Sequence, residues 1–246
     1  MMQMPRRRTL AGLLGTLLLT GTTMAQQNST ETSLADQLAE KTAQFAARAP
    51  EERKAAFQKG IDMVRATGIE KSAKQVGDKA VDGTAEDWQG NTVQLSELWN
   101  KGPVVLMWYR GGWCPYCNLQ LRAMQQNLDQ IENAGARLVV MTPELPAKAQ
   151  QTAEASGIDI VALHDANNEL AKKYGIVFDL PEPIAPMYRD SGRLKTYNGN
   201  DDLQLPLSAT YVVDQSGKIT YAFLDADYKK RAEPSEVIAA VKAAAK

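Results

Sequence analysis

Cysteine and histidine are scarce in this chain of 246 residues, which has two of the first and one of the second. Both cysteines, Cys114 and Cys117, lie in one stretch that reads YRGGWCPYC, and His164 follows about fifty residues later. Because a structural zinc site needs four ligands, a single chain with this supply is poorly equipped to form one. We therefore expect no metal and no other cofactor, and we interpret His164 as a packed or solvated loop residue.

The chain also lacks a surplus of basic residues. It has 28 Lys and Arg against 29 Asp and Glu, which gives a formal net charge of −1. The basic runs KK and KKR are short, and aromatic residues are not interleaved with them. Nucleic-acid-binding surfaces gather positive charge on one face or along one element. Nucleic acid is therefore not expected as a partner.

Long apolar runs are missing except near the N-terminus, where TLAGLLGTLLLTGTTMA follows three arginines at positions 6–8. A basic start, a short apolar core and small residues at Thr23 and Ala25 are typical of a secretory signal peptide. We predict that residues 1–25 are such a signal, cleaved near Ala25; an uncleaved anchor is the alternative. The paired arginines leave twin-arginine export open. The protein is then expected to be periplasmic or secreted, and to meet a membrane only during export.

Cleavage would leave about 221 residues, in which 25 basic residues stand against 29 acidic ones. This length suffices for one core and an appendage. Residues 26–72 are predicted to form a helical extension, because apolar residues recur at spacings of three and four and a second helix begins at Pro50. The extension has no cluster of chemical residues, so we interpret it as a packing arm or as the contact of a homodimer. Residues 73–246 are predicted to form the main domain.

In the main domain, apolar strand patterns alternate with helical ones. The run PVVLMWY at 103–109 is the kind of continuous apolar segment that forms a central buried strand. A long helix is predicted over 115–131, and two late strands are joined by a turn at 215–217. The other expected elements are a hairpin within 87–98, strands at 137–143, 160–165, 209–214 and 218–224, and helices at 146–156, 167–175 and 234–245. This order is typical of an α/β fold whose central mixed sheet is flanked by helices.

The two cysteines suit either a structural staple or a redox couple. A disulfide that closes four residues contributes only roughly 2 kcal/mol in the loop-entropy model, against roughly 3 kcal/mol for fifteen residues. The redox interpretation fits better, because Cys114 stands directly before Pro115 at a predicted helix start. Unpaired N–H groups at a helix start stabilise a thiolate and lower the thiol pKa. Cys117 is placed to resolve a mixed disulfide or a sulfenic acid on Cys114.

The residues just before the pair are candidate supporting residues. Arg110 would supply a cation near Cys114, unless it is an ordinary exposed residue at a strand end. Gly111 and Gly112 would let a partner approach the sulfur closely. Trp113 would cover a disulfide, pack in the core, or do both.

A strand that ends in WYRGGWCPYC and runs into a helix resembles the thioredoxin fold. Residues 76–246 are similar to the peroxiredoxin-like branch of the alkyl hydroperoxide reductase/thiol-specific antioxidant family. The similarity lies in three segments, which read VGDKAVDGTAEDWQGNTVQLSEL, GPVVLMWYRGGWCPYCNLQLRAMQ and SATYVVDQSGKITYAFLDADYKKRAEPSEVIAAV. The resemblance implies a thioredoxin-like fold with an N-terminal helical extension. It also implies a thiol peroxidase in which Cys114 attacks a small peroxide and Cys117 closes a redox-active disulfide. An external dithiol, such as a thioredoxin-like protein, would then reduce that disulfide.

The chain departs from the family pattern around the cysteines. Peroxiredoxins have Thr or Ser three residues before the attacking Cys and Pro seven residues before it, where this chain has Gly111 and Met107. They also have an Arg near the late central strand, where this chain reads LPLSATYVV. Peroxide activation therefore falls to another group, such as Arg110.

These departures favour a second function, protein thiol–disulfide exchange, as an alternative. Cys114 would then attack a substrate disulfide, and Cys117 would release the product. Compared with thioredoxins, Ser208 occupies the place of the cis-proline, with Pro206 two residues earlier, and Trp108 occupies that of a buried acid. The glutathione-binding features of glutaredoxins are missing. A third hypothesis is a non-catalytic binding module whose helical extension is the interface.

Overall fold

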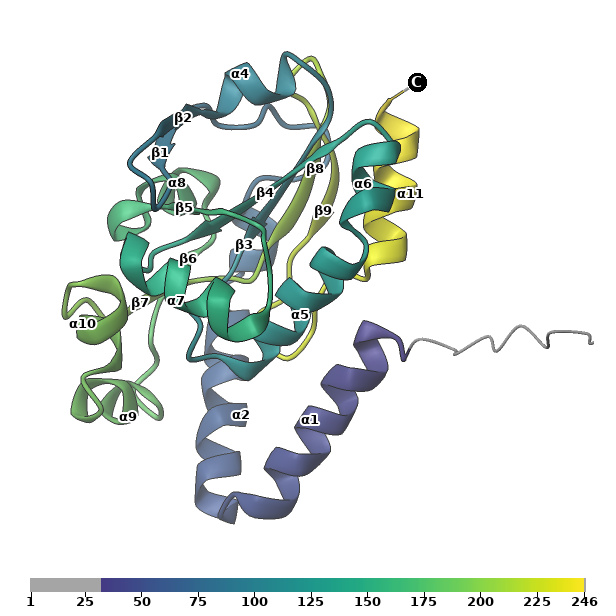
Figure 1. The fold of residues 1–246 in the computed structure, drawn as a ribbon. Coiled ribbons are helices and arrows are strands. Elements are labelled where there is room, and N and C mark those ends of the chain that lie inside the picture. Colours follow the sequence, from purple (N-terminus) through teal and green to yellow (C-terminus); the bar gives the residue numbers. More distant parts are fainter. Residues whose placement is uncertain (1–31, 246) are drawn as a thin grey trace, which may run out of the picture. The chain divides into compact units, whose positions relative to one another are not determined.

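A mixed sheet of seven strands lies at the centre of residues 32–245, which are the residues that the computed structural model describes (Figure 1). In chain order the strands are β1 (Thr84–Glu86), β2 (Thr92–Gln94), β3 (Val104–Trp108), β4 (Arg137–Thr142), β5 (Ala162–His164), β8 (Thr210–Val213) and β9 (Ile219–Phe223). They lie side by side in the order β2-β1-β5-β4-β3-β8-β9. Because β3 runs parallel to β4 and antiparallel to β8, the predicted mixed sheet is confirmed.

Helices cover both faces of this sheet. Those of the main domain that pack on it are α4 (Leu95–Trp99), α5 (Pro115–Gln126), α6 (Leu128–Asn133), α7 (Pro146–Ser156), α8 (Glu169–Tyr174) and α11 (Pro234–Ala244). Successive side chains of β3 point to opposite faces. Val105 and Met107 therefore pack with α5, α6, α7 and α11, whereas Leu106 and Trp108 pack with α4 and α8. Every residue of β3 is buried, which accounts for its continuous apolar run.

Helices also precede the sheet, as the apolar spacing predicted. They are α1 (Leu34–Arg48), α2 (Glu51–Ala66) and the short α3 (Ile69–Ser72). Ser33 caps α1, because its hydroxyl accepts a hydrogen bond from the backbone N–H of Asp36 at 3.1 Å. Leu34 and Leu38 are buried in the same cluster as residues of α5, so α1 packs against the helix that carries Cys117. The domain boundary near residue 72 stays a prediction, and the predicted signal peptide lies outside the described residues.

The helix predicted over 115–131 is in fact two helices, α5 and α6. The first helix ends at Asn127, whose φ of −106° and ψ of 9° are not helical. The Asn127 side chain donates a hydrogen bond to the backbone oxygen of Ala123 at 2.9 Å, which is how asparagine competes with a helix backbone. The hairpin predicted within 87–98 begins earlier in the chain, because its first strand is β1 at 84–86. Its second strand ends at Gln94, and α4 follows directly.

The segment between α8 and β8 contains elements that no sequence pattern predicted. They are β6 (Val177–Asp179), α9 (Ala185–Asp190), α10 (Arg193–Asn198) and β7 (Gln204–Pro206). β6 and β7 pair with each other in a separate two-stranded sheet. Elements this short show no readable periodicity. The segment matters for function because it brings Tyr188 of α9 to the cysteine region.

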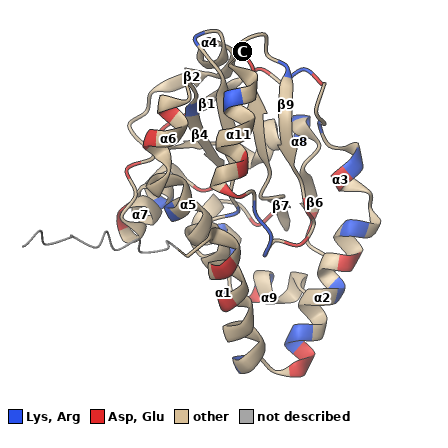
Figure 2. Cartoon of the chain, turned by 90° about the vertical axis from the view of Figure 1, so that its right-hand side faces the viewer, with Lys and Arg blue, Asp and Glu red and all other residues tan. Residues whose placement is uncertain are grey.

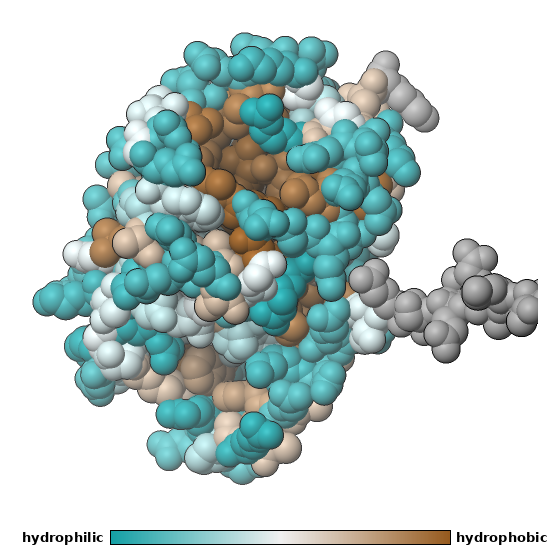
Figure 3. Space-filling view, in the orientation of Figure 1, coloured by the Kyte–Doolittle hydropathy of each residue, from teal (hydrophilic) through white to brown (hydrophobic). Residues whose placement is uncertain are grey.

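The surface of the described residues is mixed in character. Lys or Arg positions alternate with Asp or Glu positions along α2 and α3 (Figure 2). Hydrophilic side chains cover most of the face drawn in Figure 3, and apolar ones gather in a hollow over the sheet between α4 and α6. Between residues 32 and 245, no helix has both the length and the apolar character needed to cross a membrane.

Candidate active site

The two cysteines lie where the chain passes from β3 into α5. Cys114 is the N-terminal cap of α5, and Pro115 is its first residue, as the sequence predicted. Both cysteines are free, and both are buried, with exposed fractions of 2% for Cys114 and 0% for Cys117. The structure thus shows the reduced form of a buried dithiol.

The two thiols titrate as a coupled pair, and the surroundings favour a single negative charge on Cys117. Burial opposes that charge, but the hydrogen bond from the Cys114 thiol and the nearby guanidinium groups outweigh it. The pKa of Cys117 therefore lies well below its ordinary value. Burial and the hydrogen bond to Cys117 raise the pKa of Cys114 well above its ordinary value. This differs from the expectation of a lowered pKa on Cys114, which weighed the helix start and Arg110 but not burial or the hydrogen bond to Cys117.

Arg231 supplies the direct contact with the sulfur. It lies between β9 and α11, with an exposed fraction of 6%. One guanidinium nitrogen donates to Sγ of Cys117 at 3.5 Å, and another donates to the backbone oxygens of Tyr228 and Lys230. These carbonyl contacts hold the guanidinium in place. Because the site is buried, its charge acts on the sulfur with little screening by water.

Arg110 is a second buried cation near the pair, rather than an exposed residue at a strand end. Its guanidinium donates to the hydroxyl of Tyr188 at 2.8 Å. It also lies over the rings of Tyr228 and Trp113, at 4.5 and 5.1 Å from their centroids. Burial opposes its charge, but attraction to Tyr188 and Cys114 outweighs burial and raises the pKa of Arg110. The predicted cation beside the dithiol is therefore present.

The two glycines make room for packing, and the expectation that they let a partner approach the sulfur stays a prediction. A Cβ on Gly111 would lie 2.2 Å from Nε1 of Trp113, and the φ of Gly111 is 148°. A Cβ on Gly112 would lie 2.0 Å from Oγ1 of Thr152 in α7. Trp113 itself is half-buried and packs edge-on against Tyr188, with ring centroids 5.5 Å apart. The motif is therefore tightly enclosed.

Replacing Gly112 with Ala is expected to destabilise the fold by about 1–3 kcal/mol, because the added methyl group meets Thr152 and α7 must shift. Unfolding in urea measures this change. Gly60→Ala is the matched control, because Gly60 lies inside α2 and its added Cβ would meet the flexible end of Ile184 at 3.2 Å. Alanine has a higher helix propensity than glycine by about 1 kcal/mol, which offsets the cost of the close contact with Ile184. We therefore expect little net change in stability. Equal stability of both variants would contradict the packing role of Gly112.

A buried carboxyl group that no sequence pattern marked lies beside the motif. Glu144 follows β4 and has an exposed fraction of 0%. One of its oxygens accepts a hydrogen bond from the backbone N–H of Gly112 at 2.8 Å. The other accepts from the hydroxyl of Tyr109 at 2.7 Å and from that of Thr152 at 3.4 Å. Burial raises the pKa of Glu144.

Ser208 faces the dithiol, as its place in the sequence indicated. Its Oγ lies 4.0 Å from Sγ of Cys117. Every peptide bond among residues 32–245, including the one before Pro206, is trans. The thioredoxin cis-proline is therefore replaced here by a hydroxyl-bearing residue on an all-trans segment.

His164 is held in a packed position, in agreement with the sequence-based interpretation. Its Nδ1 contacts the backbone oxygen of Glu144 rather than either cysteine. In the part of the chain that the structure describes, no three Cys, His, Asp or Glu side chains gather as a metal site would require.

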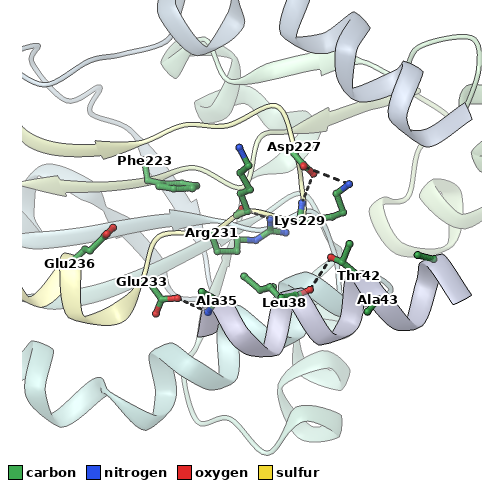
Figure 4. Close-up of a pocket in the computed structure, with 13 residues that line it drawn as sticks. Ala35, Leu38, Thr42, Ala43, Phe223, Asp227, Lys229, Arg231, Glu233 and Glu236 are labelled. Atoms are coloured by element: carbon green, nitrogen blue, oxygen red, sulfur yellow. Dashed lines mark hydrogen bonds and ion pairs between the residues drawn. The ribbon is translucent and has the colours of Figure 1, made fainter. Parts of the chain in front are cut away.

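A groove of about 690 Å³ lies between α1 and the segment that carries Arg231 (Figure 4). Alanine methyl groups and Leu38 of α1 form one wall, and Phe223 lies on the other. Glu233 ties the two walls together, because its carboxylate accepts a hydrogen bond from the backbone N–H of Ala35. The helix that packs beside the dithiol is thus held next to an open groove.

Comparison with known proteins identifies the family to which the chain belongs. Residues 76–222 match the model of the AhpC/TSA family, which is more than half of the chain. The chain belongs to the AhpC/TSA family. The resemblance to peroxiredoxin-like proteins is thereby confirmed, and with it the predicted class of enzyme, an oxidoreductase on a thioredoxin-like fold.

Individual AhpC/TSA relatives are distant. A Mycobacterium tuberculosis protein assigned to the peroxiredoxins is 29% identical over 146 residues, which are 59% of this chain and 82% of that protein. The crystal structure of peroxidoxin BcpB from Mycobacterium tuberculosis has a TM-score of 0.54 at 21% identity and covers 69% of this chain and 97% of its own. A Bacteroides thetaiotaomicron structure described as a protein disulfide isomerase has a TM-score of 0.50 at 18% identity and covers 70% of this chain and 90% of its own. The structural likeness establishes the fold and leaves the choice of substrate to the site itself.

The site of this AhpC/TSA chain combines predicted and unpredicted residues. The structure brings together the residues singled out in the sequence, which are Arg110, Gly111, Gly112, Trp113, Cys114, Pro115 and Cys117. It adds Arg231, Glu144 and Tyr188, which come from three other segments. The KKR run that contains Arg231 was visible in the sequence, but its spacing from the cysteines carries no information about contact.

Proposed function

We propose that this chain is an exported, thiol-dependent peroxidase with an antioxidant role, which works through the dithiol of Cys114 and Cys117. The observation that carries the proposal is the reduced, buried pair, with Arg231 donating to Sγ of Cys117 at 3.5 Å. Such a pair gives up one proton readily and reacts as a thiolate. Export rests on the signal peptide predicted over residues 1–25.

The proposed cycle begins with proton transfer along the hydrogen bond from Cys114 to Cys117, which makes Sγ of Cys114 the nucleophile. This sulfur attacks one peroxide oxygen and the O–O bond breaks. Cys114 becomes a sulfenic acid, and the departing oxygen takes a proton from solvent to form an alcohol or water. The Cys117 thiol then attacks the Cys114 sulfur, a disulfide forms and water leaves. An external dithiol, such as that of a thioredoxin-like protein, reduces the disulfide in two exchange steps and is itself oxidised.

In this proposal Arg110 and Arg231 replace the Thr and Arg that the sequence lacks at the usual peroxiredoxin positions. Both guanidinium groups are buried, with exposed fractions of 4% and 6%. Fixed cations in a water-poor site stabilise charge that develops in a transition state. Here they would stabilise the attacking thiolate and the negative charge on the departing oxygen.

Protein thiol–disulfide exchange is the second candidate function. Ser208, which faces Cys117 at 4.0 Å, favours it, as does Gly111 in the place of the peroxidase Thr. Burial of both sulfurs weighs against it, because exposed fractions of 2% and 0% mean that neighbouring side chains cover them. A protein disulfide needs this cover to move before the first attack, whereas a small peroxide is little larger than water. A homodimer formed through α1 and α2 stays a prediction.

A Cys117→Ser variant is expected to stop the cycle at its first covalent product and so to separate the two candidates. For a peroxidase, hydrogen peroxide converts Cys114 to a sulfenic acid, which dimedone traps for mass spectrometry, at a rate above that of reaction with a disulfide-bonded test protein. A mixed disulfide that accumulates faster than the sulfenic acid would support exchange and contradict the peroxidase. The double variant Cys114→Ser/Cys117→Ser is the control and should give neither product.

A further inference from the structure

Glu144 is a buried ionisable group that the proposed cycle does not use. Among residues 32–245, no Lys or Arg side chain forms an ion pair with it, although its exposed fraction is 0%. A carboxylate in an apolar interior costs stability unless hydrogen bonds satisfy it. The donors that satisfy this carboxylate therefore indicate what it does.

Those donors lie on the cysteine motif and next to it. The N–H of Gly112, two residues before Cys114, donates to one carboxyl oxygen at 2.8 Å. The hydroxyl of Tyr109, the residue after β3, donates to the other at 2.7 Å. One side chain thus holds the turn between β3 and α5 at two points, and Thr152 adds a weaker contact from α7. Because Cys114 caps α5 at the end of this turn, the carboxyl group helps to fix the position of its sulfur.

The same carboxyl group is a second negative charge near the dithiol. Burial is the main cause of its raised pKa, and repulsion from the Cys117 thiolate adds to it. Repulsion between two sites is mutual, so an ionised Glu144 makes the thiolate on Cys117 less favourable. Arg231 and Arg110 act on that thiolate in the opposite direction.

We propose that Glu144 is a positioning residue of the dithiol, which anchors the turn before Cys114 and sets how readily Cys117 holds a negative charge. The proposal rests on one part of the proposed function, namely that Cys114 and Cys117 are the redox-active pair. Four groups face Glu144: the hydroxyl of Tyr109, the amide of Gly112, the hydroxyl of Thr152 in α7, and His164 of β5. Three groups face Cys117: the thiol of Cys114 and the guanidinium groups of Arg231 and Arg110.

Glu144→Gln tests this role, because glutamine keeps an acceptor for Gly112 and a hydrogen-bonding group for Tyr109 but removes the charge. Without the repulsion, the thiolate becomes more stable and the dithiol becomes a weaker reductant. We expect the ultraviolet absorbance of the thiolate to appear at lower pH than in wild type. We also expect the equilibrium with dithiothreitol to shift toward the protein dithiol by roughly three- to tenfold, where tenfold corresponds to about 30 mV.

Two further variants make this test specific. Glu144→Asp keeps the charge and is expected to titrate close to wild type. Asp165→Asn is the matched control, since Asp165 is also buried but accepts hydrogen bonds from Trp108 and from the start of α8. It should leave the titration and the equilibrium unchanged. A folded Glu144→Gln variant whose titration and equilibrium match wild type would overturn the proposal. These measurements need no peroxide turnover, so they hold even if the peroxidase assignment fails.

Discussion

A Cys114→Ser variant is expected to lose peroxide consumption by roughly a thousandfold or more, because the covalent route through a sulfenic acid is removed. Serine has nearly the shape of cysteine, but its hydroxyl is not ionised at neutral pH. Cys117 keeps its thiolate and its contact with Arg231, yet its exposed fraction is 0%. In the proposed cycle Cys117 resolves the sulfenic acid and does not attack peroxide, so it does not replace Cys114. Hydrogen peroxide consumption with dithiothreitol as reductant measures the effect.

The matched control for this loss is Cys117→Ser. That variant keeps the attacking sulfur but loses the thiol that accepts its proton and later resolves the sulfenic acid, so a slower single turnover with peroxide should persist while formation of the disulfide stops. Thermal unfolding of both variants checks that the buried site remains folded. Peroxide consumption by Cys114→Ser at the wild-type rate would assign the attack to another group and refute the proposed cycle.

The parts of the fold that could be predicted are those in which local pattern and tertiary burial agree. β3 was predicted because all its side chains are buried, so an unbroken apolar run is its natural sequence. The start of α5 was predicted because proline is favoured at a first helical position. The segment from β6 to β7 could not be predicted in this way. Its short elements are held by a separate apolar cluster that includes Leu180, Leu194 and Leu205, and such contacts leave no period in the sequence.

Some residues of the candidate site could likewise be predicted from the sequence, and others could not. The cysteines and Arg110 are neighbours in the sequence, so a strand followed by a helix is enough to bring them together. Glu144 follows β4 and Arg231 lies between β9 and α11, so only the closed fold decides that their side chains meet the cysteine motif. The same limit applies to Gly112, because the sequence shows a residue without a side chain but not that Thr152 fills the space beside it.

Arg231→Met is expected to slow peroxide reduction at neutral pH by roughly 10- to 100-fold. A hydrogen bond to a charged group contributes about 1.5–3 kcal/mol, and methionine has a similar length without the charge. Because the guanidinium lowers the pKa of Cys117, its loss raises that pKa. Fewer molecules then carry a thiolate at neutral pH, and the pH profile of the reaction moves to higher pH. Rates of iodoacetamide alkylation and of peroxide reduction, each measured against pH, should show the same displacement and should approach wild type in alkaline solution.

Lys230→Met removes the same charge from the adjacent position and is the matched control. Lys230 is exposed, and its ammonium group pairs with Asp225 at 3.1 Å rather than with a sulfur. Exposed pairs of this kind contribute little, so we expect its rate and pH profile to stay near those of wild type. If both variants shifted the profile equally, the effect would come from the net charge of the segment and not from the contact with Cys117. A shift confined to Arg231→Met would instead assign the readily ionised thiol to that one contact, made by a residue outside the motif.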